Sequence, residues 1–262
     1  MSSLLVSPVH AAIEADLERR FGGLRRLYGD EGYACIRGAH VVVVGVGGVG
    51  SWSVEALARS GVAALTLIDM DQVSESNINR QVQALGTTVG RSKTQALRER
   101  IADIHPGCVV HGIEEFVDET NWPGLLNSPA AALIDACDQV RAKATLAAWA
   151  IASGTQLVSV GAAGGKKAAQ AVEVADLADV THDPLLASLR QRLRQQHGAS
   201  RKGLLGVRCV YSREPVIAPA AGGDATLNCH GYGSTVSVTA TFGMVAAGEV
   251  LSFLAHGTKE HA

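Results

Sequence analysis

The residues of this chain that can do chemistry together lie between Gly45 and Lys93. A glycine-rich turn comes first, in the stretch VVVVGVGGVG, where Gly45, Gly47, Gly48 and Gly50 follow a β-branched run and precede a helical pattern. Glycines in such a turn let a phosphate approach the backbone at a helix N-terminus, where unpaired N–H groups favour anions. We therefore expect a nucleotide at this turn, rather than glycines that serve packing alone.

Acidic residues follow at the end of the next predicted strand, 64–69. Asp69 ends that strand, where an acid can accept hydrogen bonds from ribose hydroxyls. Asp71 lies two residues later and can do the same. The sequence leaves open which of these two carboxylates holds a ribose.

A polar and basic group distinguishes this site from an ordinary dinucleotide site. Its members are Asn77, Arg80, Gln81 and Lys93. Arg80 can bind a phosphate bidentately, and Lys93 begins a predicted helix, where a cation is unfavourable unless an anion lies near. An NAD enzyme has no evident need for this Arg–Lys pair. An enzyme that cleaves a triphosphate at its α-phosphate does need such charges, so we expect a triphosphate here.

The elements that must position these residues alternate along the chain. Strands are predicted at 40–44, 64–69, 108–111, 131–135 and 156–160, and helices at 49–60, 92–104, 118–126 and 140–153. A helical arm, 17–36, is broken at Gly22. A strand at 170–174, a helix at 184–196, a strand at 207–211 and a helix at 236–254 complete the chain. This order predicts an α/β fold, a doubly wound, mostly parallel Rossmann-like sheet with helices on both faces and a C-terminal extension.

Composition narrows the class of protein. The 262 residues are 47% hydrophobic and carry a net charge of −2, so global charge does not indicate a nucleic-acid or membrane partner. The five cysteines form no CxxC pair and are odd in number, which argues against a cysteine zinc site and a disulfide framework and fits a reducing cytosol. Residues 1–20 contain acids and arginines without an apolar core, so we expect no signal peptide and a cytoplasmic location.

The apolar segment 236–254 raises the question of a membrane helix. Glu249 interrupts it, and a charge at the bilayer centre costs about 3 kcal/mol. Gly243 and Gly248 suit close helix packing. We therefore favour a buried or dimer-interface helix over a membrane span.

Longer motifs resemble the ThiF/MoeB/HesA superfamily, whose fold is shared with ubiquitin-activating enzymes. The motifs are GVGGVGSW, LIDMDQVSESNINRQ, GRSK and DACDQV. Further segments are similar to the tRNA threonylcarbamoyladenosine dehydratases within it: EALARSG, VRAKA, GAAGG, GVRCVYS and GYGSTVSVTATFG. The likeness covers the chain from Arg20 to Ala247.

This resemblance implies an activity. Members of the superfamily adenylate a carboxylate with Mg-ATP and release pyrophosphate. The dehydratases activate the carboxylate of threonylcarbamoyladenosine next to the anticodon of certain tRNAs, and ring closure then expels the activating group. The resemblance thus implies ATP-dependent dehydration of that nucleoside through an acyl-adenylate, in a homodimer that uses ATP and Mg²⁺ and binds tRNA, not DNA.

It also implies roles for residues and regions. Superfamily members hold Mg²⁺ with an acid at the position of Asp138, which follows Asp135; alternatively, Asp138 caps the helix that starts near Val140. An N-terminal arginine of the partner subunit reaches the terminal phosphates, and both Arg20 and Arg26 are candidates. The chain is then one adenylating domain over 1–262, with an N-terminal helical arm (1–38), a nucleotide-binding core (39–160) and a substrate and dimer region (161–262).

Two other functions compete with this one. Activators of ubiquitin-like sulfur carriers usually bind zinc through two CxxC pairs, which this chain lacks, so we expect no structural zinc. Cys229 lies near where such activators place a reactive cysteine, and we favour a non-nucleophilic role for it. A non-catalytic nucleotide-binding sulfur-relay scaffold is disfavoured by the presence of Arg80, Lys93 and Asp138. A cysteine-desulfurase or sulfur-acceptor partner stays open.

Basic residues gather on the predicted helix 184–196 and just after it. They are Arg190, Arg192, Arg194, Arg201 and Lys202. Leu186, Leu189 and Leu193 share one side of this helix, so the arginines fall largely off the apolar stripe. We expect this patch to contact the anticodon stem; the alternative is an ordinary solvated helix face.

Overall fold

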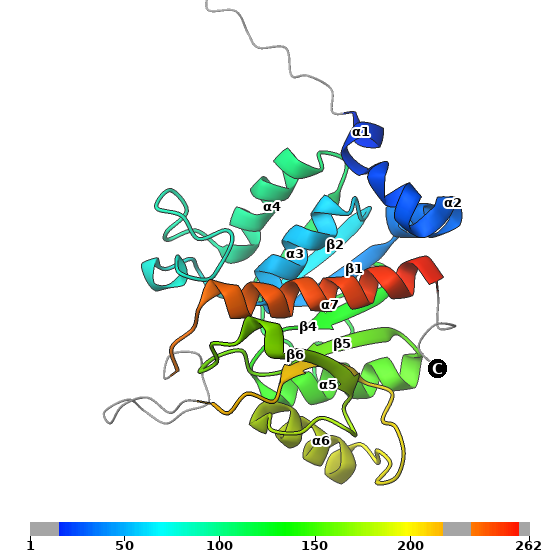
Figure 1. Cartoon of the computed structure of the whole chain (residues 1–262), viewed down its shortest axis with the longest axis vertical. Coiled ribbons are helices and arrows are strands. Elements are labelled where there is room, and N and C mark those ends of the chain that lie inside the picture. The colour runs from blue at the N-terminus through cyan, green and yellow to red at the C-terminus, as the bar shows by residue number, and fades with distance from the viewer. Residues whose placement is uncertain (1–15, 217–231, 257–262) are drawn as a thin grey trace, which may run out of the picture.

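The seven strands in the described part of the chain belong to one sheet. The computed structural model describes residues 16–216 and 232–256. The strands are β1 (His40–Val44), β2 (Ala64–Ile68), β3 (Val109–Ile113), β4 (Ala132–Asp135), β5 (Gln156–Val160), β6 (Val172–Asp176) and β7 (Arg208–Ser212). They lie in the order β3-β2-β1-β4-β5-β7-β6, and only β6 runs antiparallel to its neighbour (Figure 1). The predicted α/β fold is confirmed.

The chain order of the strands reverses between β1 and β4, and this sets the place of the site. Along the sheet, β2 and β3 extend from one side of β1, while β4 and β5 extend from the other. Val41 to Val44 are buried and pair in parallel register with Ala132 to Asp135. The connections that leave the carboxyl ends of β1 and β4 therefore diverge, and a ligand crevice opens where they separate.

Helices cover both faces of the sheet. They are α1 (Leu17–Phe21), α2 (Gly23–Gly38), α3 (Gly50–Arg59), α4 (Lys93–Ile104), α5 (Val140–Ser153), α6 (Pro184–Gln196) and α7 (Val236–His256), with short 3₁₀ turns η1 (Glu75–Asn77) and η2 (Ala169–Ala171). Apolar side chains of α3, α4 and α7 pack on one face, and those of α5 and α6 on the other (Figure 1). The predicted break between α1 and α2 falls at Gly22, as expected.

The last helix, α7, packs across α3. A Cβ on Gly243 would lie 2.4 Å from the carbonyl oxygen of Val49, and the Ser53 hydroxyl donates to the carbonyl of Gly243 at 2.9 Å. Among the described residues, α7 alone is long and apolar enough to cross a membrane. It also packs against α3, and this packing explains why one side of α7 is apolar. Nothing within the described chain lies within 4 Å of a Cβ placed on Gly248, so close packing at that glycine stays a prediction for a dimer interface.

The helix predicted at 118–126 is a series of turns instead. The Asp118 carboxylate accepts hydrogen bonds from the backbone N–H groups of Thr120 (2.7 Å) and Asn121 (3.0 Å). Short polar side chains compete in this way with helical backbone bonding. Pro123 has no N–H to contribute, so a helix over this segment would lack one of its backbone hydrogen bonds.

A buried ion pair joins the carboxyl ends of β4 and β5. The Lys143 ammonium, from α5, lies 2.9 Å from Asp135 Oδ2, and both side chains are 0% exposed. The same ammonium donates to the Val160 carbonyl at 2.8 Å, and Ser159 Oγ donates to Asp135 Oδ2 at 2.7 Å. Burial alone would lower the pKa of Lys143, but Asp135 outweighs it and raises that pKa, so the lysine stays charged.

We predict that Lys143→Met lowers the free energy of unfolding by about 3–5 kcal/mol, because it leaves the Asp135 carboxylate buried without a counter-charge. Urea titration of the purified variant measures this loss. Arg141→Met on the same helix is the matched control, since Arg141 is exposed and should change stability by less than about 0.5 kcal/mol. Equal effects of the two variants would show that the buried pair does not stabilise the fold.

Candidate nucleotide-binding site

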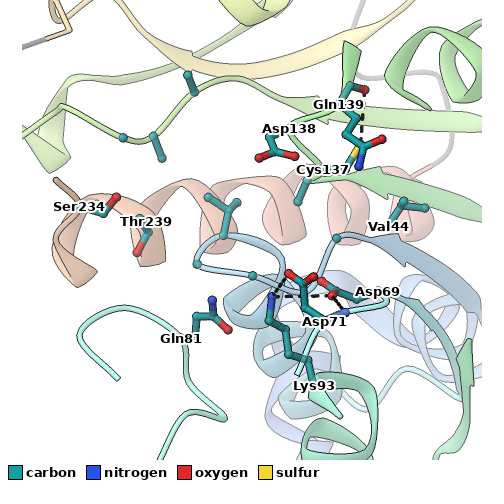
Figure 2. A pocket seen from close by; sticks show the side chains of 18 of the residues that line it. Val44, Asp69, Asp71, Gln81, Lys93, Cys137, Asp138, Gln139, Ser234 and Thr239 are labelled. Atoms are coloured by element: carbon teal, nitrogen blue, oxygen red, sulfur yellow. Dashed lines mark hydrogen bonds and ion pairs between the residues drawn. The ribbon is translucent and has the colours of Figure 1, made fainter. Parts of the chain in front are cut away.

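A cavity of about 430 Å³ lies at the carboxyl ends of the central strands. Its size matches that of small-molecule sites in proteins. The glycine turn after β1, the segments after β2 and β4, and the starts of α4, α6 and α7 contribute to its wall. Figure 2 shows Asp138 on the opposite side of this cavity from Asp71 and Lys93.

The glycine turn is held by close backbone contacts. Gly45 has a φ of 80°, and a Cβ there would lie 2.8 Å from the backbone nitrogen of Cys137. A Cβ on Gly50 would lie 1.9 Å from the carbonyl oxygen of Gly45. Only glycine fits at either position, and the chain therefore turns directly from β1 into α3.

This turn presents free hydrogen-bond donors to the cavity. The backbone N–H groups of Gly47, Gly48 and Val49, which line the cavity, have no acceptor within the described part of the chain. The positive end of the α3 dipole lies at the same place. An anion such as a phosphate can accept hydrogen bonds from these N–H groups and is also favoured by the helix dipole.

Asp69, Asp71 and Lys93 form one group beside the turn. Asp69 accepts from the backbone N–H of Val46 at 2.8 Å and from that of Asp71 at 2.9 Å. Lys93 Nζ donates to Asp71 Oδ2 at 2.7 Å and lies 3.7 Å from Asp69 Oδ1. Burial raises the pKa of Asp69 above its usual value, although Lys93 and the two N–H donors oppose that shift.

These contacts give Asp69 and Asp71, the two candidate ribose-binding acids, different structural roles. Asp71 is the direct partner of the Lys93 ammonium, and Asp69 anchors the glycine turn through Val46. Each carboxylate keeps lone pairs for a ribose hydroxyl, and both side chains line the cavity. Lys93 is nearly buried with a donor to spare, so its charge is fixed in place at the cavity wall.

Arg80 lies across the glycine turn. A Cβ on Gly48 would lie 3.3 Å from the Cγ and Cδ atoms of Arg80, so the arginine stem occupies the room that glycine leaves. Its guanidinium donates to the Ser76 carbonyl at 2.8 Å and to Asn79 Oδ1 at 2.9 Å. Trp52 Nε1 donates to the Arg80 carbonyl at 2.9 Å, which holds the backbone. Three of the five guanidinium donors stay available for a ligand.

Asn77 and Gln81 build the wall next to Arg80. Asn77 Oδ1 accepts from the backbone N–H of Ser74 at 3.1 Å and closes η1. Gln81 Oε1 accepts from Gln83 Nε2 at 3.0 Å, and the same nitrogen donates to the Val46 carbonyl. Both predicted site residues are buried in the cavity wall, where they support the turn.

Asp138 stands alone on the opposite wall. Its carboxylate is exposed, lines the cavity and makes neither a hydrogen bond nor an ion pair with the rest of the described chain. The alternative in which Asp138 caps a helix is excluded, because Gln139 occupies the N-cap of α5 without a side-chain hydrogen bond. A free carboxylate facing a phosphate site can hold a divalent cation.

The two N-terminal arginine candidates lie away from the cavity of their own chain. Arg20 Nη1 donates to the carbonyl groups of Asp103 and Ile104, both at 2.7 Å, at the end of α4. Arg26 is exposed on α2. Contact between either arginine and a nucleotide of a partner subunit stays a prediction. Cys229 lies outside the described residues.

Sequence reasoning missed several residues of the cavity wall. Cys137, Gln139, Phe116, Ser234 and Thr239 all line it. Cys137 Sγ lies 3.0 Å from Asp135 Oδ1, and burial raises the pKa of this thiol well above its usual value. Four of these residues lie in the motifs DACDQV and GYGSTVSVTATFG. The motifs could therefore have pointed to them, but their residue types alone did not indicate a role.

Comparison with known proteins decides the family. The ThiF family profile matches residues 20–262. The tRNA threonylcarbamoyladenosine dehydratase of Haemophilus influenzae is 41% identical over 244 residues, which are 90% of this chain and 94% of that protein. The chain belongs to the tRNA threonylcarbamoyladenosine dehydratases of the ThiF family.

Solved structures of this dehydratase family agree. The Escherichia coli tRNA N6-threonylcarbamoyladenosine dehydratase in complex with ATP has a TM-score of 0.84 and 42% identity, covering 92% of this chain and 96% of that one. The Bacillus subtilis dehydratase is 35% identical over 72% of each chain. The glycine turn and cavity described above thus belong to a chain whose relative binds ATP.

We predict that this dehydratase-family protein contains no stoichiometric zinc and that EDTA does not shift its Tm. Among residues 16–216 and 232–256, no group of three or more His, Cys, Asp or Glu side chains is placed to hold a metal ion. Elemental analysis and thermal unfolding with and without EDTA measure this. One zinc per chain, or unfolding by EDTA, would contradict it, since a structural zinc site contributes directly to folding.

Proposed function

We propose that this protein catalyses the ATP-dependent dehydration of threonylcarbamoyladenosine in tRNA. One observation carries the proposal: Arg80, Lys93 and three uncommitted backbone N–H groups converge on one cavity, with a free carboxylate, Asp138, facing them. The ATP complex of the similar E. coli enzyme supports the same cavity as the nucleotide site. An NAD enzyme has no evident need for this Arg–Lys pair.

The chemistry that the site supports begins at the α-phosphate of ATP. A carboxylate oxygen of the modified nucleoside attacks that phosphorus, the bond to pyrophosphate breaks, and an acyl-adenylate forms. Charge that develops on the phosphoryl oxygens and on pyrophosphate is stabilised by Arg80, by Lys93 and by the N–H groups of the turn. Ring closure at the activated carbonyl then expels AMP, so the net change in the base is loss of one water.

Asp138 is the residue that would hold Mg²⁺. An ion held by this carboxylate would help to neutralise the charge of the phosphates. Asp138 fits that role because its oxygens face the cavity without a protein partner. Among the described residues no group of three or more His, Cys, Asp or Glu side chains is placed to form a separate metal cage, so the nucleotide would have to provide ligands as well.

The active form is a homodimer in this proposal. Both Arg20 and Arg26 point away from the cavity of their own chain, so a terminal-phosphate contact from the arm requires a second copy. Region 161–262 supplies substrate and dimer contacts, and its loop 161–164 already forms part of the cavity wall. Of the described residues 16–38, none lines that cavity in a single chain.

The direct test uses the full chain with tRNA that carries threonylcarbamoyladenosine. We expect incubation with Mg-ATP to produce a nucleoside lighter by one water, measured by mass spectrometry after digestion. Omission of ATP, or addition of excess EDTA, should abolish the product, because the reaction needs both the triphosphate and the divalent ion. Release of AMP without change in the nucleoside would contradict the dehydratase function.

We predict that Arg80→Ala lowers turnover about 10²-fold or more, as expected for loss of one preorganised electrostatic donor. Lys93→Ala should lower turnover by a similar factor. Arg80 is half-exposed and bonds only neutral acceptors, so circular dichroism of Arg80→Ala should match the wild type. Arg91→Ala is the control, since Arg91 pairs with Glu99 outside the cavity. Near-normal turnover in both the Arg80 and Lys93 variants would exclude adenylation at this site.

A further inference from the structure

A second concave surface lies along α6 and the loop that follows it. Its volume is about 340 Å³, and its lining consists of Ala187, Arg190, Gln191, Arg194, Gln195 and Arg201. We call this surface the arginine cleft. Apart from one alanine the lining is cationic or carboxamide, and it contains no carboxylate.

Neutral groups hold two of the three arginines in place. Arg190 Nη1 donates to the carbonyl groups of Leu177 (2.9 Å) and Val180 (2.7 Å), and Arg194 Nε donates to the Ser200 carbonyl (3.2 Å). Each guanidinium has five N–H donors, so most remain unused. The arginine cleft is therefore built from the fold itself, with donors to spare.

The third arginine has no partner at all in the described part of the chain. Arg201 is exposed and makes neither a hydrogen bond nor an ion pair with residues 16–216 or 232–256. None of the three guanidinium charges in the cleft is paired with an acid. Three like charges on one concave surface repel one another, and a bound anion relieves that repulsion.

The surrounding sequence keeps this charge uncompensated. Six arginines, one lysine and no acidic residue lie between Asp183 and Glu214. Acids from other elements pair with two of the three arginines outside the cleft, at 2.7 Å between Arg208 and Glu249 and at 3.1 Å between Arg213 and Glu173; Arg192 has no acidic partner in the described part of the chain. The three cleft arginines share one concave surface and none has an acidic partner, which distinguishes this surface from an ordinary solvated helix face.

One helix connects the arginine cleft with the nucleotide cavity. Pro184 and Leu185, at the start of α6, line the cavity, and Arg194 lies near its end. At a rise of 1.5 Å per residue the two are about 15 Å apart. Each strand of a duplex carries a phosphate about every 3.4 Å along the axis, so a nucleic acid with one base in the cavity can reach the cleft within a few nucleotides.

We propose that the arginine cleft binds backbone phosphates of the substrate RNA. The inference rests on the proposed function, because it takes the modified base to be in the cavity at the other end of α6. Guanidinium groups match phosphate oxygens in planar, bidentate geometry. Such contacts fix the register of the RNA on the protein without reading its sequence. Of the basic residues that the sequence analysis expects to contact tRNA, the arginine cleft contains Arg190, Arg194 and Arg201.

The experiment compares Arg201→Glu with Arg98→Glu in the full chain. Arg98 is an exposed arginine of α4, on the opposite face of the sheet, and gives the same change in net charge. Affinity for tRNA is measured without ATP between about 50 and 200 mM salt. Arg201→Glu should weaken binding about tenfold and lower the slope of log affinity against log salt by about one, as for one lost phosphate contact. Arg98→Glu should leave both quantities unchanged.

Two further measurements separate this inference from the proposed function. Mg-ATP affinity should be the same in wild type and Arg201→Glu, and the tRNA KM of Arg201→Glu should rise while its kcat is kept. If wild type dehydrates the nucleoside but Arg201→Glu binds tRNA normally, or both variants weaken binding equally, the cleft assignment is wrong and the function stands. If wild type does not dehydrate the nucleoside, the proposed function fails, and selective loss of RNA binding in Arg201→Glu would still identify an RNA site.

Discussion

The site depends on a carboxylate that never meets solvent. Asp135 ends β4 and is bonded by the Lys143 ammonium, the Ser159 hydroxyl and the backbone N–H of Cys137. These bonds fix the end of β5 and the first residues after β4 against α5. The segment that carries Asp138 therefore leaves the sheet at a set angle, and Asp138 needs no partner of its own to be held over the cavity.

The wall opposite Asp138 is shaped by close backbone contacts that only glycine permits. Gly45 and Gly50 allow backbone contacts that any side chain would block, which brings the N-terminus of α3 to the mouth of the cavity. Arg80 fills the space above Gly48, and Lys93 is held by Asp71. Arg80, Lys93 and the N–H groups of the turn thus lie on one side of the crevice, and the unpaired carboxylate of Asp138 lies on the other, as suits a polyphosphate with a divalent cation.

Local patterns predicted the strands and this first wall. A run of four valines followed by glycines has few alternatives to a buried strand and a tight turn, and parallel topology then places Asp69, Arg80 and Lys93 at one edge. The burial of Lys143 could not be predicted from the residues around it. Its partner, Asp135, belongs to β4, and the two side chains meet only when α5 packs on the sheet. The helix predicted at 118–126 was wrong because of local rather than distant contacts. Polar side chains of this segment form hydrogen bonds with its own backbone, which compete with helix formation.

The N-terminal arm and the cavity wall are linked through one helix. Arg20 grips the last carbonyl groups of α4, and Lys93 is the first residue of that same helix. With 12 residues, α4 is a strut about 18 Å long. The arm and the Lys93 ammonium are therefore attached to opposite ends of one helix. The wall of the cavity and the arm outside it thus share a single structural element, although no residue of α1 or α2 lines the cavity.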